Sequence, residues 1–411
     1  MEDSMKTIGQ GLDNFQAALK QSGSSLEEFI KENYMAKWMS DELVAAMHIR
    51  TTFVQACLNF LQDEGLLNIE KVMLSILTDP LAHDIEHTPS IRYKGHMYVT
   101  THSMIYAKFL ACSNKNIKGI YVDSPNIRLE LESPMNIQRG KYLADFSQID
   151  IELRRNRGIT IEEYYHKQKM VRDVLNEDFD KIKNFFERMI AAAVSRVIEK
   201  NSGELDLLGV AMEVPKIPFP SFRKDEGVAK YGAKEFEEKC GETTDSQFYW
   251  ITGLFRENYD LVYPYLLPDG KKVDIKSVDS PSIYNYDIVA KSINKKTGNH
   301  TLGREILSGA IREWLFDPIV ERIIDNRVLP ERPVIRDGNI ENIAALGGYG
   351  PFLQYASMKD EKGKPLFPDT MGGGIGIERT LFALLRGDKI QKVDDLTFFG
   401  KNPDSHPLYL F

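Results

Sequence analysis

Apolar residues recur with two different periods along the chain, and each period marks one kind of predicted element. Helical spacing runs through the first forty residues, and a longer amphipathic helix is expected from Asp41 to the stop at Gly65. The period shortens to two in the segments Ile120 to Glu132 and Ala144 to Arg154, which predicts two strands joined by a polar loop. The first half of the chain is therefore expected to combine helices with an antiparallel hairpin.

The second half repeats this combination. Residues 160–200 have helical spacing with a break expected near Asn176, and strand-like runs return at Phe248 to Leu267 and Tyr284 to Ala290. The polar tract from Ser292 to His300 contains a Thr-Gly-Asn turn sequence and is expected to form an inserted hairpin tip. Helices that bracket an antiparallel sheet, without regular strand–helix alternation, predict an α+β fold.

These elements predict one large domain with two additions. The chain of 411 residues divides into an N-terminal helical extension, residues 1–40, and a main domain, residues 41–411. The main domain is expected to contain a helical insertion at about 160–245, where strand patterning is absent.

The two predicted strands of the hairpin each carry a polar face. Because side chains alternate along a strand, each strand places its polar residues on one side. These residues are Arg128, Glu130 and Glu132 on the first strand, and Phe146, Gln148, Asp150 and Glu152 on the second. Such a surface can hold a phosphate, a base and a metal ion, whereas the simpler alternative is a solvated face with salt bridges.

A glycine run near the C-terminus adds to this surface. Gly372, Gly374 and Gly376 alternate, so one face of this strand lacks side chains, and a flat ligand can lie on the backbone there. Glu378 and Arg379 follow the run directly. The alternative is an ordinary turn, because the run contains neither a P-loop nor a Rossmann fingerprint.

Composition narrows the choice of partners. Lys and Arg total 52 against 60 Asp and Glu, and the net charge of -8 gives no overall reason to bind a polyanion. No apolar stretch approaches the ~18 residues of a membrane span, and no signal segment precedes the first helix. A cytoplasmic protein without a membrane or nucleic-acid partner is therefore expected.

Four blocks of sequence resemble one family. The segments Ser124 to Glu130 and Tyr142 to Glu152 resemble motif 2 of class II aminoacyl-tRNA synthetases, aspartyl and asparaginyl subgroup, and Gly372 to Arg379 resembles motif 3. The segments Tyr286 to Val289 and Gly303 to Glu313 are similar to the metal and substrate segments of that subgroup. The resemblance covers roughly residues 41–411 and implies the antiparallel sheet of this class, flanked by helices.

The resemblance also implies roles for residues at an ATP site. Arg128 matches the arginine on the α-phosphate, Phe146 the ring under adenine, and Arg379 the arginine on the γ-phosphate and adenine. Asp287 and Glu305 match the acids that hold Mg²⁺ on ATP, so ATP and Mg²⁺ are the implied cofactors. The remaining positions implied for ATP binding are Glu130, Lys141, Gly374 and Gly376.

The resemblance further implies an acidic amino acid as substrate. Lys108 lies in a segment where aspartyl enzymes place a lysine on the non-reacting carboxylate and asparaginyl enzymes do not. Arg312, seven residues after Glu305, matches the arginine that grips the same carboxylate. Gln148 and Ser308 complete the implied substrate positions, and Arg128, Arg379 and Lys108 are the expected catalytic residues.

The predicted acceptor of the activated acid depends on whether the sequence has room for an anticodon-binding module. Only about forty helical residues precede the motif 1 helix, and 25 follow Arg386, so no OB-fold of ~100 residues is expected. The segments Leu77 to Leu81, Ser103 to Ile105 and Ser124 to Glu130 resemble the archaeal-type asparagine synthetases related to asparaginyl-tRNA synthetase, which implies ammonia as acceptor and asparagine as product. The alternatives are another small amine, a tRNA supplied in trans, and a non-catalytic amino-acid sensor.

The sequence departs from the family pattern at the rim of the implied pocket. Lys141 and Tyr142 stand where the motif 2 loop has an arginine and a histidine, and Thr370 replaces a histidine before motif 3. Lys71 or Val72 occupies the position of the motif 1 proline, although the family implies a homodimer through motif 1.

Overall fold

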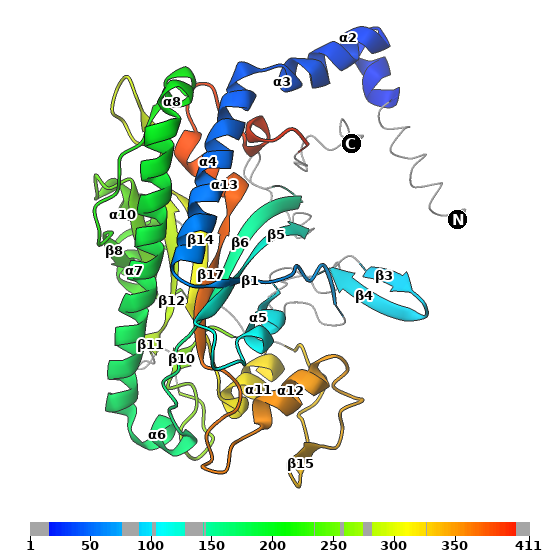
Figure 1. Cartoon of the computed structure of the whole chain (residues 1–411), viewed down its shortest axis with the longest axis vertical. Helices are drawn as coiled ribbons and strands as arrows, with labels where there is room; N and C mark the ends of the chain where they lie inside the picture. Colours follow the sequence, from blue (N-terminus) through cyan, green and yellow to red (C-terminus); the bar gives the residue numbers. More distant parts are fainter. Residues whose placement is uncertain are drawn as a thin grey trace.

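The computed structural model describes residues 16–75, 90–100, 104–127, 143, 145–233, 235–254, 259–273, 282–325 and 327–399. The described residues form an eight-stranded sheet in the order β1-β5-β6-β17-β14-β12-β9-β8 (Figure 1). The inner strands pair antiparallel, whereas β1 and β8 pair parallel at the two edges. In sheet order the strands are β1 (Leu67–Asn68), β5 (Gly119–Ile127), β6 (Asp145–Arg154), β17 (Thr370–Gly376), β14 (Arg304–Ile311), β12 (Asn285–Ala290), β9 (Phe248–Thr252) and β8 (Ser221–Arg223).

Helices surround this sheet, as the α+β prediction requires. Helix α4 packs against α7 and α13, and α13 packs against β6 and β14 of the sheet (Figure 1). In chain order the helices of the main body are α4 (Asp41–Asp63), α5 (Ile105–Ala111), α6 (Ile161–His166), α7 (Gln168–Lys200), α8 (Ser202–Leu208), α9 (Lys224–Tyr231), α10 (Phe236–Glu242), α11 (Phe316–Asp325), α12 (Tyr349–Ser357) and α13 (Ile377–Leu385).

Short strands decorate the body. A three-stranded sheet consists of β2 (Leu74–Ser75), β4 (His96–Thr100) and β3 (Ser90–Tyr93), and its hairpin projects from the body in Figure 1. The two-stranded sheets are β7 (Val210–Ala211) with β13 (Ile293–Asn294), β10 (Val262–Tyr263) with β11 (Ser282–Ile283), and β15 (Ile335–Arg336) with β16 (Asn339–Ile340).

The long helix predicted at Asp41 is confirmed. The Ser40 hydroxyl accepts a hydrogen bond from the backbone N–H of Leu43 and caps α4, and Gly65 follows the last turn with a φ of 81°. A positive φ favours glycine because the residue has no Cβ, which explains why the helix stops there. Its inner face, including Ile49 and Phe53, is buried in the main core.

The prediction of a break near Asn176 is wrong. Helix α7 runs without interruption from Gln168 to Lys200, and the discontinuity lies at Lys167, between α6 and α7. The side chain of Asn176 accepts a hydrogen bond from the Tyr284 hydroxyl at 3.2 Å. A side chain engaged in this way does not compete for its own backbone, and the helix continues.

The first described residues form a helical arm. It contains α2 (Leu26–Ile30), a π-helical turn at Lys31–Met35 and α3 (Ala36–Trp38), and it extends from the start of α4 in Figure 1. Trp38 ties the arm to the C-terminal segment, because its indole donates to the Phe398 carbonyl and its ring packs 6.3 Å from that of Phe399. The division into an extension and a main domain stays a prediction.

A buried acid of α7 contacts both the sheet and the segment before β8. Glu187 of α7 accepts hydrogen bonds at Oε1 from the Trp250 indole at 2.7 Å and from the Phe219 backbone N–H at 2.9 Å. We therefore expect Glu187→Ala to lower the free energy of unfolding by about 2 kcal/mol or more, since two buried donors lose their acceptor. Urea denaturation measures this loss.

The matched control for this prediction is Glu199→Ala on the same helix. Glu199 is exposed, and among the described residues its ion pair is with Arg196 on the helix surface, so its replacement should change stability by less than about 0.5 kcal/mol. Equal stability of the two variants would contradict the proposed anchoring role of Glu187.

Candidate active site

The register of the sheet brings the predicted segments together. Asp287 of β12 lies opposite Ser308 of β14, Ser308 lies opposite Gly374 of β17, and Gly374 lies opposite Asp150 of β6. Residues directly opposite one another in a sheet project to the same side. Four strands that are distant in sequence therefore contribute one continuous row to a single face.

The predicted polar face of β6 has the expected sidedness. Phe146, Gln148, Asp150 and Glu152 alternate with Ile149 and Ile151, both of which are fully buried in the core. Gln148 is paired with Gly376 on one side and with Ser124 on the other. The ring of Phe146 is partly buried and packs at the border of the main core.

The space beside the alternating glycines differs from the prediction of a strand face without side chains. A Cβ at Gly372 would collide with the Ile151 carbonyl and lie 2.7 Å from Glu152 Oε2, and one at Gly374 would meet the amide of Gln148. At Gly376, by contrast, the nearest atom is Arg379 Cβ at 3.8 Å. Two glycines thus make room for polar side chains of β6, and Gly376 alone leaves open space.

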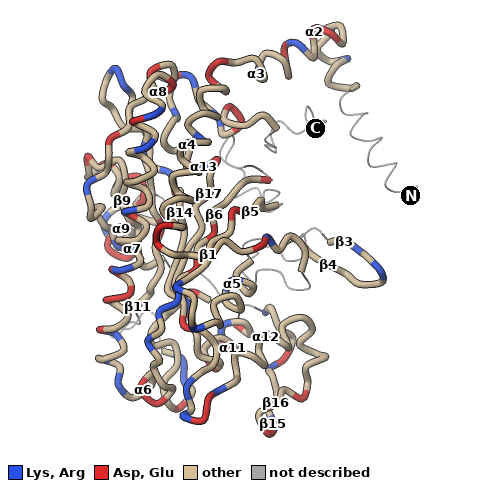
Figure 2. Tube along the Cα trace, viewed as in Figure 1, with Lys and Arg blue, Asp and Glu red and all other residues tan. Residues whose placement is uncertain are grey.

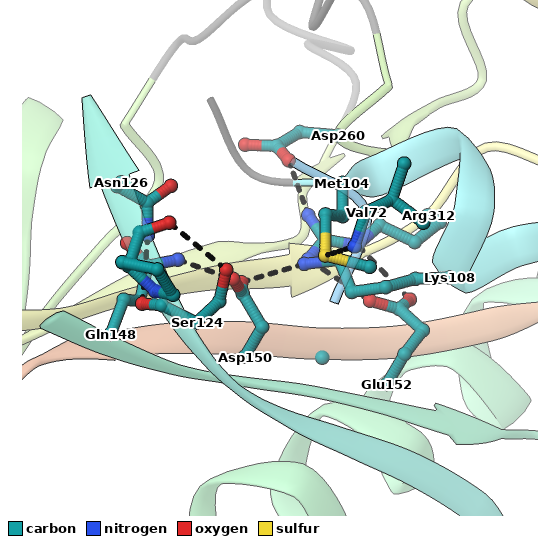
Figure 3. A network of polar contacts seen from close by, with 12 residues as sticks. Val72, Met104, Lys108, Ser124, Asn126, Gln148, Asp150, Glu152, Asp260 and Arg312 are labelled. Carbon is teal, nitrogen blue, oxygen red and sulfur yellow. Dashed lines mark hydrogen bonds and ion pairs between the residues drawn. The ribbon is translucent and has the colours of Figure 1, made fainter. Parts of the chain in front are cut away.

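Lys108 lies at the centre of a buried polar network (Figure 3). It extends from α5, and its Nζ donates to Asp150 Oδ1 at 2.8 Å, where the Gln148 amide also donates at 2.7 Å. The side chains of Lys108 and Asp150 are 2% and 1% exposed. The second oxygen of Asp150 is buried without a hydrogen-bond partner among the described residues.

Arg312 continues the network at the end of β14. Its Nε and Nη2 donate to the two carboxylate oxygens of Glu152, at 3.2 and 3.4 Å, and its Nη1 donates to Asp260 at 3.1 Å. Burial disfavours its charge, but the Glu152 and Asp260 carboxylates outweigh this effect and raise the pKa of Arg312. The guanidinium therefore stays charged inside the protein.

The two acids predicted to hold a metal share a face. Asp287 is 8% exposed, and Glu305 lies opposite Val289, two residues further along β12. Carboxylate oxygens suit Mg²⁺, which commonly uses one or two of them together with phosphates and water, so this pair fits the ion. Arg379, also predicted for the ATP site, donates to Glu305 Oε1 at 2.9 Å, and a bound nucleotide would compete for this arginine.

The predicted residues thus fall into two groups. The structure brings ten of them to this face, namely Lys108, Phe146, Gln148, Asp287, Glu305, Ser308, Arg312, Gly374, Gly376 and Arg379. Arg128, Glu130 and Lys141 lie outside the described residues. These positions alone do not test the roles that the sequence resemblance implies for these residues.

Asp150 and Glu152 were placed on the predicted polar face without an individual role, and Asp260 was not predicted at all. Asp150 and Glu152 had a usable signal, because they follow Gln148 with a period of two. Asp260 had none: it forms an isolated bridge with Arg312, and its second oxygen accepts from Asn285 at 3.0 Å. Only the three-dimensional structure identifies Asp260 as a partner of the arginine.

One face of the largely antiparallel sheet thus combines acids, cations and glycines from β6, β12, β14 and β17. Residues 25–402 match the family model described as tRNA synthetases class II (D, K and N), and the chain belongs to this family. The fold predicted from the resemblance is therefore confirmed.

Relatives with known names share limited identity with the chain. The aspartate–tRNA(Asp) ligase of Thermococcus kodakarensis is 24% identical over 296 residues, which are 71% of this chain but only 58% of that protein. The asparagine–tRNA ligase of Thermoplasma acidophilum is 21% identical over 377 residues, 89% of this chain and 72% of that protein. The matched part thus spans less than two thirds of the Thermococcus ligase.

Solved structures show the same fold. The asparaginyl-tRNA synthetase of Pyrococcus horikoshii, complexed with asparaginyl-adenylate, superposes with a TM-score of 0.59 at 16% identity, covering 93% of this chain and 74% of that one. The aspartyl-tRNA synthetase of Entamoeba histolytica superposes with a TM-score of 0.56 at 16% identity, covering 97% and 67%. At these identities the likeness establishes the fold alone.

The glycine geometry predicts a contrast between two substitutions. Gly372→Ala should lower the free energy of unfolding by about 2 kcal/mol or more, because the new methyl group overlaps the Ile151 carbonyl. Gly376→Ala should stay within about 0.5 kcal/mol of the unsubstituted protein, since its methyl group has space. Chemical denaturation of both variants checks this contrast, and similar losses in the two would contradict the described packing.

Proposed function

We propose that this chain activates aspartate with ATP to form aspartyl-adenylate and pyrophosphate. The observation that carries the proposal is the buried network in Figure 3, where cationic donors and a partly unpaired carboxylate lie side by side. An amino acid with an acidic side chain carries the complementary groups, two carboxylates and one ammonium.

The cations retain donors for a ligand. Among the described residues, only Asp150 accepts from the ammonium group of Lys108, which has three N–H donors. Arg312 uses three of its five N–H groups on Glu152 and Asp260. A substrate carboxylate can therefore join both cations without displacing their present partners.

Asp150 supplies the opposite charge. Its Oδ2 is buried and faces no donor among the described residues, so an ammonium group would gain a charge-assisted hydrogen bond there. The cluster contains two cations and three carboxylates, and its formal charge of about -1 favours a ligand that brings a cation as well as an anion.

The nucleotide half of the site is supported by the neighbouring row. The ring of Phe146 lies at the start of β6. Gly376, which has open space beside it, lies opposite Gln148, two residues from Asp150 along β6. Asp287 and Glu305 would hold Mg²⁺, which when bound supplies charge neutralisation of the phosphates. Arg379 lies beside them and would stabilise negative charge on the polyphosphate.

The reaction then requires positioning more than acid–base chemistry. One oxygen of the substrate carboxylate forms a bond with the α-phosphorus of ATP, and the bond from that phosphorus to the pyrophosphate oxygen breaks. Holding the non-reacting carboxylate on Lys108 and Arg312 would leave the other carboxylate to attack. The adenylate bound to the Pyrococcus enzyme supports the same chemistry in a protein of this fold.

The acceptor of the adenylate has two candidates. The sequence predicts ammonia, or another small amine, with asparagine as the product of the ammonia reaction. The names of the relatives support a tRNA instead, and they give no support to the expectation that a nucleic-acid partner is unlikely. Lys and Arg are interspersed with Asp and Glu along α7, so charge on this helix favours neither candidate (Figure 2).

Pyrophosphate exchange tests the activation step. We expect ATP-dependent exchange with aspartate and much weaker exchange with asparagine, because Lys108 matches a carboxylate better than an amide. Exchange with no amino acid would contradict the proposal and favour a non-catalytic sensor. Mass spectrometry of products formed with ammonium, hydroxylamine or tRNA then identifies the acceptor.

Lys108 is the residue on which aspartate selection should depend. Lys108→Met is expected to lower kcat/KM for aspartate by about 100-fold, because a charge-assisted hydrogen bond is lost. The double variant Lys108→Met/Asp150→Asn removes both buried charges and controls for instability. A double variant that folds but keeps full preference for aspartate over asparagine would exclude this role.

Two further family properties stay proposals. A homodimer through motif 1 is supported by exposed apolar side chains on α4 and beyond it, namely Val44, Leu67 and Leu74. Sedimentation analysis is expected to give a dimer, and a monomer at micromolar concentration would exclude it.

A cytoplasmic location is likewise proposed. None of the described helices is long and apolar enough to cross a membrane.

A further inference from the structure

A single carboxylate joins three elements behind the candidate nucleotide site. Glu378 lies in the first turn of α13, is 7% exposed, and engages both of its oxygens. Its Oε2 accepts from the backbone N–H of Ser147 at 2.8 Å, and its Oε1 accepts from Arg50 Nη2 at 3.4 Å. The same Arg50 nitrogen donates to the Ser147 hydroxyl at 3.0 Å.

The position of Ser147 explains why this contact matters. The pairing of β17 with β6 ends at Gly376 opposite Gln148, and Ser147 is one residue beyond it. The Glu378 carboxylate satisfies an N–H group of β6 where the neighbouring strand has turned into a helix. An acid in the first turn of a helix is also favoured by the helix dipole.

The residues on either side of this contact belong to the candidate site. Ser147 lies between Phe146 and Gln148, and Gln148 donates to Asp150. Glu378 directly precedes Arg379, which contacts Glu305. The carboxylate thus fixes the end of β6 relative to the start of α13, and Arg50 of α4 fixes the carboxylate.

We propose that Glu378 is a positioning residue for the nucleotide, and that Arg50 orients it from α4. This inference rests on the proposed function. Ser147 points to the helix-covered side of the sheet, the side opposite Phe146, Gln148 and Asp150, so Glu378 acts through β6 and touches no substrate. Its loss should disturb the placement of Phe146 against the base more than the amino-acid pocket.

The test compares substrates in pyrophosphate exchange. Glu378→Ala is expected to raise KM for ATP about tenfold, while KM for aspartate changes less than about twofold, because the network around Lys108 stays intact. Glu378→Gln should be intermediate, since its amide oxygen can still accept from Ser147. A change in both KM values by the same factor, or in neither, would overturn the proposal.

Hydrogen exchange separates positioning from general destabilisation. In Glu378→Ala the amide of Ser147 should lose protection while amides of the β12–β14 pairing keep theirs. Uniform loss of protection would mean that Glu378 is merely structural. The matched control is Glu42→Ala, whose Oε1 accepts from Lys389 at 3.0 Å and joins α4 to the segment after α13 without contacting β6; it should leave KM for ATP unchanged.

Failure of the proposed function can be told apart from failure of this inference. If the unsubstituted protein shows no pyrophosphate exchange, the activation proposal fails, and titration with a fluorescent ATP analogue still reports the nucleotide affinity. Weaker analogue binding by about tenfold in Glu378→Ala, but not in Glu42→Ala, would then support the positioning role. Equal binding by both variants, or no binding by any of them, would overturn it.

Discussion

Two buried cations pair with three buried carboxylates on the face of the sheet that carries the candidate site. Lys108 pairs with Asp150, and Arg312 lies between Glu152 and Asp260. Loss of one partner from such a buried pair typically costs ~3–5 kcal/mol, because the remaining charge stays uncompensated. These charges lie on α5, on β6, just after β14 and in the segment before β10. The positions of these four parts are therefore coupled, because each charge needs an oppositely charged partner nearby. This coupling gives the site a fixed shape without a bound ligand.

In the proposed function, the same network determines how the site would choose a ligand. Its cations are already paired, so a substrate carboxylate gains only the hydrogen bonds left on Lys108 and Arg312, and selection depends on matching several groups at once. The buried second oxygen of Asp150 adds a requirement for a donor. An amino acid with two carboxylates and one ammonium satisfies these requirements together, whereas a simple anion does not. The glycines of β17 belong to this arrangement, because Gly372 and Gly374 leave the volume that Glu152 and Gln148 occupy.

Much of this arrangement was accessible from the sequence. Period-2 alternation correctly assigned the faces of β6, and helical periodicity from Asp41 with a glycine stop at Gly65 correctly bounded α4, because these signals are local. Long-range contacts were not accessible. Nothing in the sequence near Asp260 indicates its bond to Arg312. The hydrogen bond of Asn176 in α7 likewise depends on Tyr284, which lies 108 residues away between β11 and β12. Glycine spacing indicated missing side chains, but only packing showed which neighbours fill two of the three spaces.

The most direct measurement of the central claim is a crystal structure of the chain with a non-hydrolysable ATP analogue, Mg²⁺ and aspartate. We expect the side-chain carboxylate of aspartate to lie within hydrogen-bond distance of Lys108 and Arg312. Its ammonium group should reach Asp150, and its other carboxylate should face the α-phosphate. The adenine should lie against Phe146. Aspartate bound elsewhere, or a Lys108–Asp150 pair that stays closed to the ligand while nucleotide occupies the site, would contradict the account.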